Sequence, residues 1–100
     1  MTREDHLLVI LAEECSEIVK TATKSLRFGL NDCEPGQPES NARRICLECA
    51  DLQGVLEMLV ESSRTLKLAT ESVNLEEAIK AKKEKVEEFL KYSKRKGRLQ

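Results

Sequence analysis

Apolar residues recur every three or four positions over most of the chain, which is the spacing of one face of an α-helix. Over the first part of the chain this stripe comprises Leu8, Leu11, Cys15, Ile18, Ala22 and Leu26. Thr2 is placed to cap the segment, with Asp5 three residues later in capping-box position. Gly29 is placed just beyond the last turn, where glycine commonly ends a helix. The pattern predicts a helix over residues 3–27.

A loop over residues 28–40 follows this helix. Pro35, Gly36 and Pro38 lie within it. These residues favour turns, because proline removes a helical hydrogen bond and clashes with the preceding turn. We therefore expect the helical pattern to stop here and to resume only after the last proline.

A second helix is predicted over residues 41–63, with Ser40 or Asn41 as its cap. Its apolar residues cover most of the circumference: Ile45, Leu47, Cys49, Leu52, Val55, Leu56, Met58, Leu59 and Val60. A helix that is apolar on nearly all sides is normally buried on nearly all sides. We expect such burial here.

The remaining residues predict one more long helix. Residues 64–73 fit either an extension of the second helix or a short separate one. Asn74 can then cap a last helix over residues 75–96, with Glu77 as its capping partner and Gly97 at its end.

The predicted fold is therefore all-α, an antiparallel helical bundle formed by a single domain over residues 1–100. A chain of 100 residues has too little other material to cover a second helix that is apolar all round. Pairing with further copies would complete the bundle. We therefore expect a homo-oligomer, either a dimer or a tetramer.

Composition and charge exclude several classes of protein. Hydrophobic residues make up 40% of the chain, and 17 basic against 18 acidic residues leave a net charge of −1. This balance argues against intrinsic disorder and against a dedicated nucleic-acid binder. No run of residues approaches the length of a membrane span, and no secretory signal is visible. We expect a cytoplasmic protein that binds neither membranes nor nucleic acid.

Four cysteines raise the possibility of disulfides or a zinc site: Cys15, Cys33, Cys46 and Cys49. Disulfides are disfavoured in a reducing compartment. Zinc is disfavoured because only one pair has the Cys-x-x-Cys spacing and His6 is the only histidine. We therefore expect the cysteines to pack in the core as small apolar side chains.

Two pairs of acidic residues border apolar positions of the predicted helices. Glu14 and Glu17 are three residues apart on the first helix, and Glu48 and Asp51 are three apart on the second. Each pair therefore lies on one helical face, without Lys or Arg inside either acidic segment. Such oxygen ligands suit Mg²⁺ or Mn²⁺. A di-iron site is disfavoured because it uses Glu-x-x-His pairs. The alternative is that all four acids are ordinary solvated residues of amphipathic helices.

These residues carry a family resemblance. Glu13-Glu14-Cys15-Ser16-Glu17-Ile18, followed further along by Glu48-Cys49-Ala50-Asp51-Leu52, resembles the EExxE(L/I)…ExxD signature of MazG-like proteins. These are all-α nucleoside triphosphate pyrophosphohydrolases. The resemblance implies hydrolysis of an NTP or dNTP to the monophosphate and pyrophosphate. It also implies Mg²⁺ ligands at Glu14, Glu17, Glu48 and Asp51, with catalytic roles for Glu13 and Glu14.

The triphosphate also requires cations from the protein. The basic candidates that could bind it are Lys24, Arg27, Lys82, Lys85, Lys94 and Arg95. The few aromatic residues that could stack on a base are Phe28, Phe89 and Tyr92. Neither set indicates which base or sugar is preferred. A non-enzymatic helical interaction module, an inactive nucleotide-binding relative and a nucleic-acid accessory protein using residues 91–98 remain alternatives.

Overall fold

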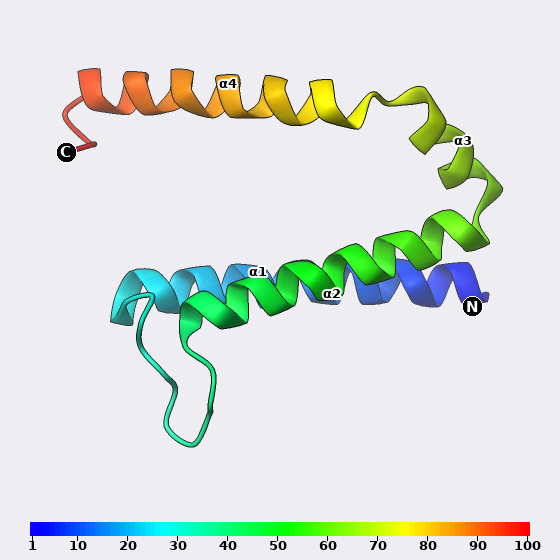
Figure 1. Ribbon diagram of the computed structural model, residues 1–100, viewed down its shortest axis with the longest axis horizontal. Coiled ribbons are helices and arrows are strands. Elements are labelled where there is room, and N and C mark those ends of the chain that lie inside the picture. Colours follow the sequence, from blue (N-terminus) through cyan, green and yellow to red (C-terminus); the bar gives the residue numbers. More distant parts are fainter. The chain divides into compact units, whose positions relative to one another are not determined.

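The computed structural model describes all 100 residues, and its only regular elements are helices. They are α1 (Arg3–Phe28), α2 (Asn41–Ser62), α3 (Arg64–Ser72) and α4 (Leu75–Arg95) (Figure 1). The chain divides into two compact units, Met1–Lys67 and Leu68–Gln100. The prediction of an all-α protein is confirmed.

Helix α1 begins and ends through the local contacts that its sequence predicts. The Thr2 hydroxyl accepts a hydrogen bond from the Asp5 N–H at 3.1 Å, and the Asp5 carboxylate accepts one from the Thr2 N–H at 2.9 Å. The bonds from Thr2, first from its backbone and then from its side chain, lower the pKa of Asp5. At the other end Gly29 has φ 101°, a conformation that favours glycine, and its N–H donates to the Ser25 carbonyl at 2.9 Å. The helix is one residue longer than predicted.

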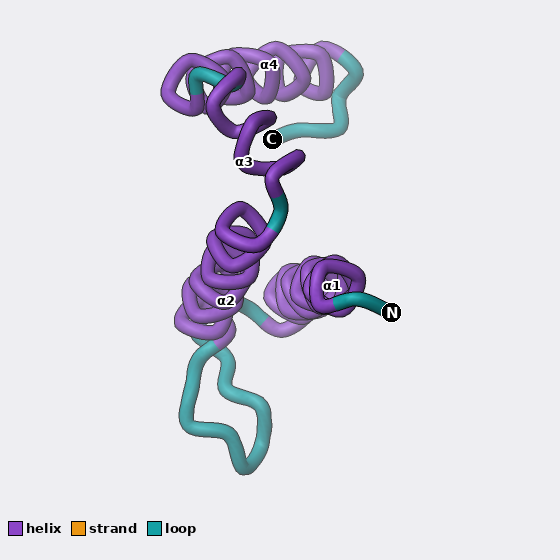
Figure 2. The backbone as a smooth tube through the Cα atoms, turned by 90° about the vertical axis from the view of Figure 1, so that its right-hand side faces the viewer, coloured by secondary structure: helices purple, strands orange, loops and turns teal.

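The loop between α1 and α2 is closed by hydrogen bonds across its base. The Asn41 N–H donates to the Asp32 carbonyl and the Ala42 N–H to the Leu30 carbonyl, both at 2.9 Å. Ser40 is the cap of α2, since its hydroxyl accepts from the Arg43 N–H at 3.2 Å. The closed loop reverses the chain, so α2 lies beside α1 and runs in the opposite direction (Figures 1 and 2).

Residues 64–73 fitted either an extension of the second helix or a separate one. In the structure they contain a separate short helix, α3. Ser63 leaves the helical conformation with φ −115° and ψ 115°. Its hydroxyl then accepts a hydrogen bond from the Leu66 N–H at 3.2 Å, which begins α3. Helix α4 begins as predicted, with the Asn74 side chain accepting from the Glu77 N–H at 3.1 Å. None of the helices combines the length and the apolar character that a membrane crossing requires.

The face of α1 that packs on α2 differs from the predicted stripe. The buried and half-buried positions of α1 include a stripe that recurs every three or four residues: Leu7, Leu11, Glu14, Ile18, Thr21 and Ser25. Leu11 and Ile18 were expected, but Leu8, Cys15, Ala22 and Leu26 are exposed, Leu26 at 89%. Helix α1 is apolar at six consecutive positions near its start, so periodicity does not single out one face.

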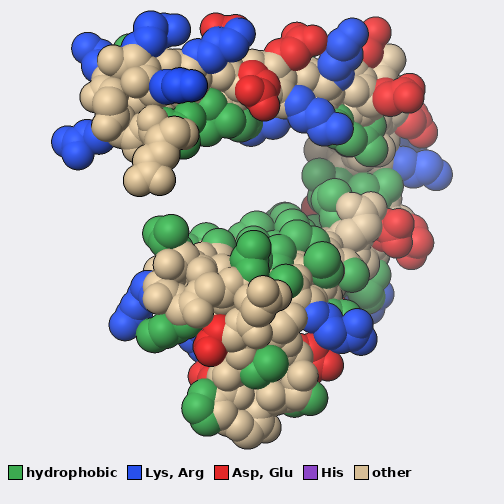
Figure 3. All heavy atoms as spheres, turned by 60° about the vertical axis from the view of Figure 1, so that its left-hand side comes forward, with side chains coloured by type: hydrophobic (Ala, Val, Ile, Leu, Met, Phe, Trp, Pro, Cys, Tyr) green, Lys and Arg blue, Asp and Glu red, His purple; other side chains and the backbone are tan.

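Helix α2 is covered on one side only, which leaves much of its apolar surface open. Its inward stripe comprises Asn41, Ile45, Glu48, Leu52, Val55, Leu59 and Ser63 just beyond its end. Leu59 is fully buried, whereas Leu47, Leu56 and Met58 are exposed. Hydrophobic side chains accordingly gather on the surface of the α1–α2 hairpin (Figure 3). Burial of α2 on nearly all sides is wrong for the single chain.

The cysteines do not belong to the core of the single chain. All four thiols are exposed, and none forms a disulfide. Cys15 lies outside the face that α1 turns towards α2, and Cys46 and Cys49 lie outside the corresponding face of α2. The expectation of core cysteines was wrong because it assigned the helix faces incorrectly.

Candidate functional site

Each helix of the hairpin places one glutamate in the middle of its inward stripe. Glu14 lies between Leu11 and Ile18 on α1, and Glu48 lies between Ile45 and Leu52 on α2. Both glutamates are half-buried. These are positions where a helix pair normally carries apolar side chains.

Glu48 carries a buried oxygen without a partner. Its Oε1 atom is inaccessible to solvent and makes no hydrogen bond. Such an orphaned buried acceptor typically costs about 1–3 kcal/mol, and more when it is charged. No Lys or Arg forms an ion pair with it. A cation bound at Glu48 would therefore offset the cost of burying this oxygen.

The other acidic residues of the two motifs lie beside these positions. Glu17 and Asp51 are exposed, each three residues after the half-buried glutamate of its own helix. Glu13 is also exposed and is a neighbour of Glu17 at the i, i+4 spacing of α1. None of these carboxylates forms an ion pair. All of them are free to accept a ligand from solution.

The carboxylates partly satisfy what a divalent cation requires. The orphaned Glu48 oxygen and the purely oxygen-based donor set suit a hard ion such as Mg²⁺ or Mn²⁺. However, the single chain does not gather three or more acidic, histidine or cysteine side chains into a group that could hold a metal. Glu14, Glu17, Glu48 and Asp51 belong to facing helices without forming a finished coordination shell. Side-chain rotation, or ligands from another copy or from a substrate, would have to complete it.

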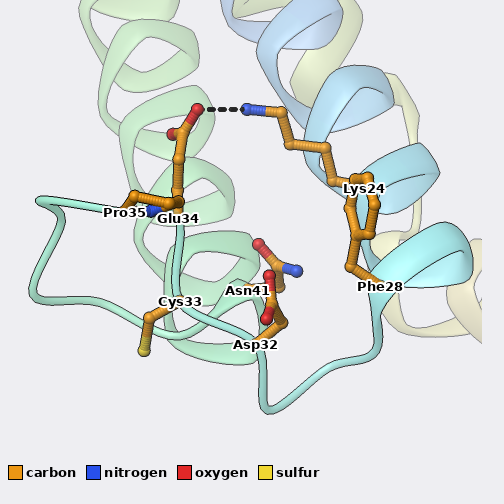
Figure 4. Close-up of a pocket in the computed structure, with 7 residues that line it drawn as sticks. All are labelled: Lys24, Phe28, Asp32, Cys33, Glu34, Pro35 and Asn41. Carbon is orange, nitrogen blue, oxygen red and sulfur yellow. Dashed lines mark hydrogen bonds and ion pairs between the residues drawn. The ribbon is translucent and has the colours of Figure 1, made fainter.

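A cavity of about 410 Å³ lies at the end of the hairpin, where α1 ends and α2 begins. Its lining residues come from both helix ends and the loop between them: Lys24, Phe28, Asp32, Cys33, Glu34, Pro35 and Asn41 (Figure 4). Lys24 Nζ donates to Glu34 Oε1 at 3.1 Å across this cavity. The hydrogen bond and charge of Lys24 lower the pKa of Glu34.

The basic candidates are divided between the two units. Lys24 and Arg27 lie on α1, Lys24 half-buried in the cavity wall and Arg27 exposed with its guanidinium 4.9 Å from the centroid of the Phe28 ring. The others lie exposed on α4, in the second unit: Lys82, Lys85, Lys94 and Arg95. Of the aromatic candidates, Phe28 lines the cavity, and Phe89 and Tyr92 are exposed on α4.

Of the residues that line this cavity, the sequence indicates a binding role only for Lys24 and Phe28. Asp32 and Glu34 fall within the predicted loop, and Asn41 is predicted only as a possible cap. Asn41 is 4% exposed and its side-chain Nδ2 donates to the Gly29 carbonyl at 2.9 Å. A buried amide at the start of α2 depends on how the loop folds back, so no spacing in the sequence signals it.

No protein-family model, curated protein or solved structure matches this chain. The resemblance to MazG-like proteins therefore rests on the two acidic motifs of the sequence alone.

Proposed function

We propose that the protein is a Mg²⁺-dependent nucleoside triphosphate pyrophosphohydrolase of the MazG-like type, which hydrolyses an NTP or dNTP to the monophosphate and pyrophosphate. The observation that carries the proposal is the buried, unpartnered Glu48 Oε1 on a helix face that packs against the face bearing Glu14. An uncompensated carboxylate at a helix interface is unfavourable unless it serves a ligand. The two acidic motifs supply further oxygens beside it.

The family resemblance suggests a role for each of these residues. Glu14, Glu17, Glu48 and Asp51 would hold the ion. Bound Mg²⁺ supplies neutralisation of phosphate charge and activation of a water for attack. Glu13, which is exposed one turn from Glu17, would accept the proton of an attacking water. Lys24, Arg27 or the basic residues of α4 would contact the triphosphate.

The proposal also includes a homo-oligomer. The hairpin exposes Leu8, Leu47 and Met58, although these are large apolar side chains. A second copy covering them would complete a helical bundle and could bring further acidic side chains to the site. Light scattering coupled to size exclusion should therefore give a multiple of the 11.3 kDa chain mass.

The direct test measures pyrophosphate release from a panel of NTPs and dNTPs, with Mg²⁺ and with a chelator. We expect Mg²⁺-dependent release that falls at least about 100-fold in Glu48→Gln, equivalent to ~2.7 kcal/mol of transition-state stabilisation. Glu57→Gln is the matched control, because Glu57 is an exposed residue of the same helix without an ion pair. Full activity of Glu48→Gln, or no release from any nucleotide, would contradict the proposal.

A non-enzymatic interaction module is the second candidate. The exposed apolar side chains of α1 and α2 favour it, since contiguous apolar surface commonly marks an interface. Such a module would not bind Mg²⁺ and would tolerate Glu48→Gln. Calorimetric titration of the wild-type protein with Mg²⁺ and Mn²⁺ therefore separates the two candidates even in the absence of turnover.

A further inference from the structure

The cavity at the end of the hairpin has a floor with hydrogen-bond acceptors that lack partners. Asn41 donates its Nδ2 to the Gly29 carbonyl, which leaves its Oδ1 without a hydrogen bond. The Asp32 carboxylate likewise makes no hydrogen bond or ion pair. Both residues are held by the backbone, because the Asn41 N–H donates to the Asp32 carbonyl at 2.9 Å. The floor therefore offers the Asn41 amide oxygen and the Asp32 carboxylate as acceptors for a ligand.

The walls of the cavity are an aromatic ring and an internal ion pair. Phe28 is 58% exposed and lines the cavity, with the Arg27 guanidinium 4.9 Å from the centroid of its ring. Figure 4 shows Phe28 on one side, Glu34 and Pro35 on the other, and Asn41 and Asp32 between them. Lys24 and Glu34 neutralise each other at 3.1 Å. Asp32 is therefore the only uncompensated charge in the lining.

This lining selects for a flat ligand whose edge carries hydrogen-bond donors. A ring face such as that of Phe28 stacks on any planar base. A carboxylate is an acceptor only, and it binds best to two adjacent N–H groups in a bidentate arrangement. Among the common nucleobases, guanine alone presents two adjacent donors, its ring N1–H and its exocyclic amine. Uracil and thymine would instead direct a carbonyl oxygen at the carboxylate.

The cavity lies at a suitable distance from the acidic motifs. Lys24 is seven residues beyond Glu17 on α1, and Asn41 is seven residues before Glu48 on α2. Seven residues are two helical turns, or roughly 10 Å. A ribose and its first phosphate extend over a comparable length, so a base in the cavity would place its phosphates near the carboxylates.

We propose that this cavity is a base-recognition site that selects guanine nucleotides, with the Asp32 carboxylate accepting from the guanine N1–H and amine and Phe28 stacking on the ring. Asn41 is a second acceptor on the same floor. As a statement about the substrate, this proposal rests on the proposed pyrophosphohydrolase function. Binding of the guanine monophosphate does not depend on turnover, so the two can fail separately.

The test is a calorimetric titration with GMP, IMP, XMP and UMP. Wild-type protein should bind GMP about tenfold more tightly than IMP, which lacks the amine, and UMP more weakly still. Asp32→Asn should bind XMP more tightly than GMP. The amide offers one acceptor and one donor, which match the carbonyl and the N–H on the edge of xanthine. The gain of XMP binding cannot result from a damaged fold. Glu61→Gln removes one exposed carboxylate of α2 outside the cavity and should leave all four affinities unchanged.

A second measurement locates the ligand. Cys33 lines the cavity with an exposed thiol, whereas Cys15 is exposed on α1 outside it. Bound GMP should slow alkylation of Cys33 and leave Cys15 unaffected, as measured by mass spectrometry of the labelled peptides. Phe28→Ala should abolish this protection.

The outcomes separate the two proposals. If GMP binds the wild-type protein and binds Asp32→Asn more weakly, but neither GTP nor dGTP releases pyrophosphate, the hydrolase proposal is overturned and the guanine site is supported. Pyrophosphate release without any preference for guanine, unchanged in Asp32→Asn, would overturn the guanine site and leave the hydrolase standing.

Discussion

Replacing Glu48 with methionine should stabilise the metal-free protein, although it removes a charged residue from a helix. The Oε1 atom of Glu48 is buried and makes no hydrogen bond, and the side chain lies between Ile45 and Leu52 on the inward stripe. Methionine has a similar length and a flexible apolar shape, so it can fill the same space. The substitution therefore removes the unsatisfied oxygen without leaving a cavity.

The expected magnitude follows from the cost of that oxygen. A buried acceptor without a partner costs about 1–3 kcal/mol. Glu48 is only half-buried as a residue, so we expect the lower end, a gain of about 1 kcal/mol in the free energy of unfolding. For a domain of this size such a gain raises the Tm by roughly 4–8 °C.

The assay is urea unfolding followed by circular dichroism, at one protein concentration, in chelator and then in Mg²⁺. An ion at about ten times its Kd should stabilise the wild-type protein by ~1.4 kcal/mol. Glu48→Met should show no such increase, because it lacks the ligand. Glu57→Met, an exposed change on α2, should stay within about 0.5 kcal/mol of wild type and keep the Mg²⁺ response.

One pair of results would refute this reasoning. If Glu48→Met is less stable than wild type in chelator, and Mg²⁺ leaves the wild-type free energy of unfolding unchanged, then the Glu48 carboxylate contributes to the apo fold and binds no cation. The proposed metal site would lose its main support.

Two further predictions concern the hairpin itself. Leu59→Ala should lower the free energy of unfolding, measured in urea, by about 2–5 kcal/mol, because Leu59 is fully buried in the hairpin that α2 forms with α1. Leu26→Ala should change it by less than about 0.5 kcal/mol, because Leu26 is 89% exposed. Equal effects of the two substitutions would contradict the observed helix faces. The hydrogen bonds from Thr2 lower the pKa of Asp5 in the folded state, so the stabilisation from Asp5 is present above its unfolded pKa and is lost as the pH falls through the folded value. The difference in urea midpoint between wild type and Asp5→Asn should therefore be full at pH 6 and shrink below about pH 4, and a difference that persists at pH 2 would contradict it.

The acidic residues of the candidate site could be recognised from the sequence, but their environments could not. Spacing places Glu14 with Glu17 and Glu48 with Asp51, because residues three apart share a helical face. Only the packed hairpin shows that Glu14 and Glu48 lie on the inward stripes while Glu17 and Asp51 are exposed. The proposed guanine site could not be predicted from the sequence, since Asp32 and Asn41 come together only when the loop closes.

The sequence by itself determined the three long helices and, to within one residue, their ends. Thr2, Ser40 and Asn74 cap their helices through contacts within three residues, and Gly29 ends α1 through its own backbone conformation. These effects are local, so they can be read from neighbouring residues. Tertiary structure decided which face each helix turns inward, because the apolar run from Leu7 to Ala12 is compatible with more than one face. Packing against α2 selects Leu7 and leaves Leu8 exposed, and the same choice places the thiol of Cys15 on the surface.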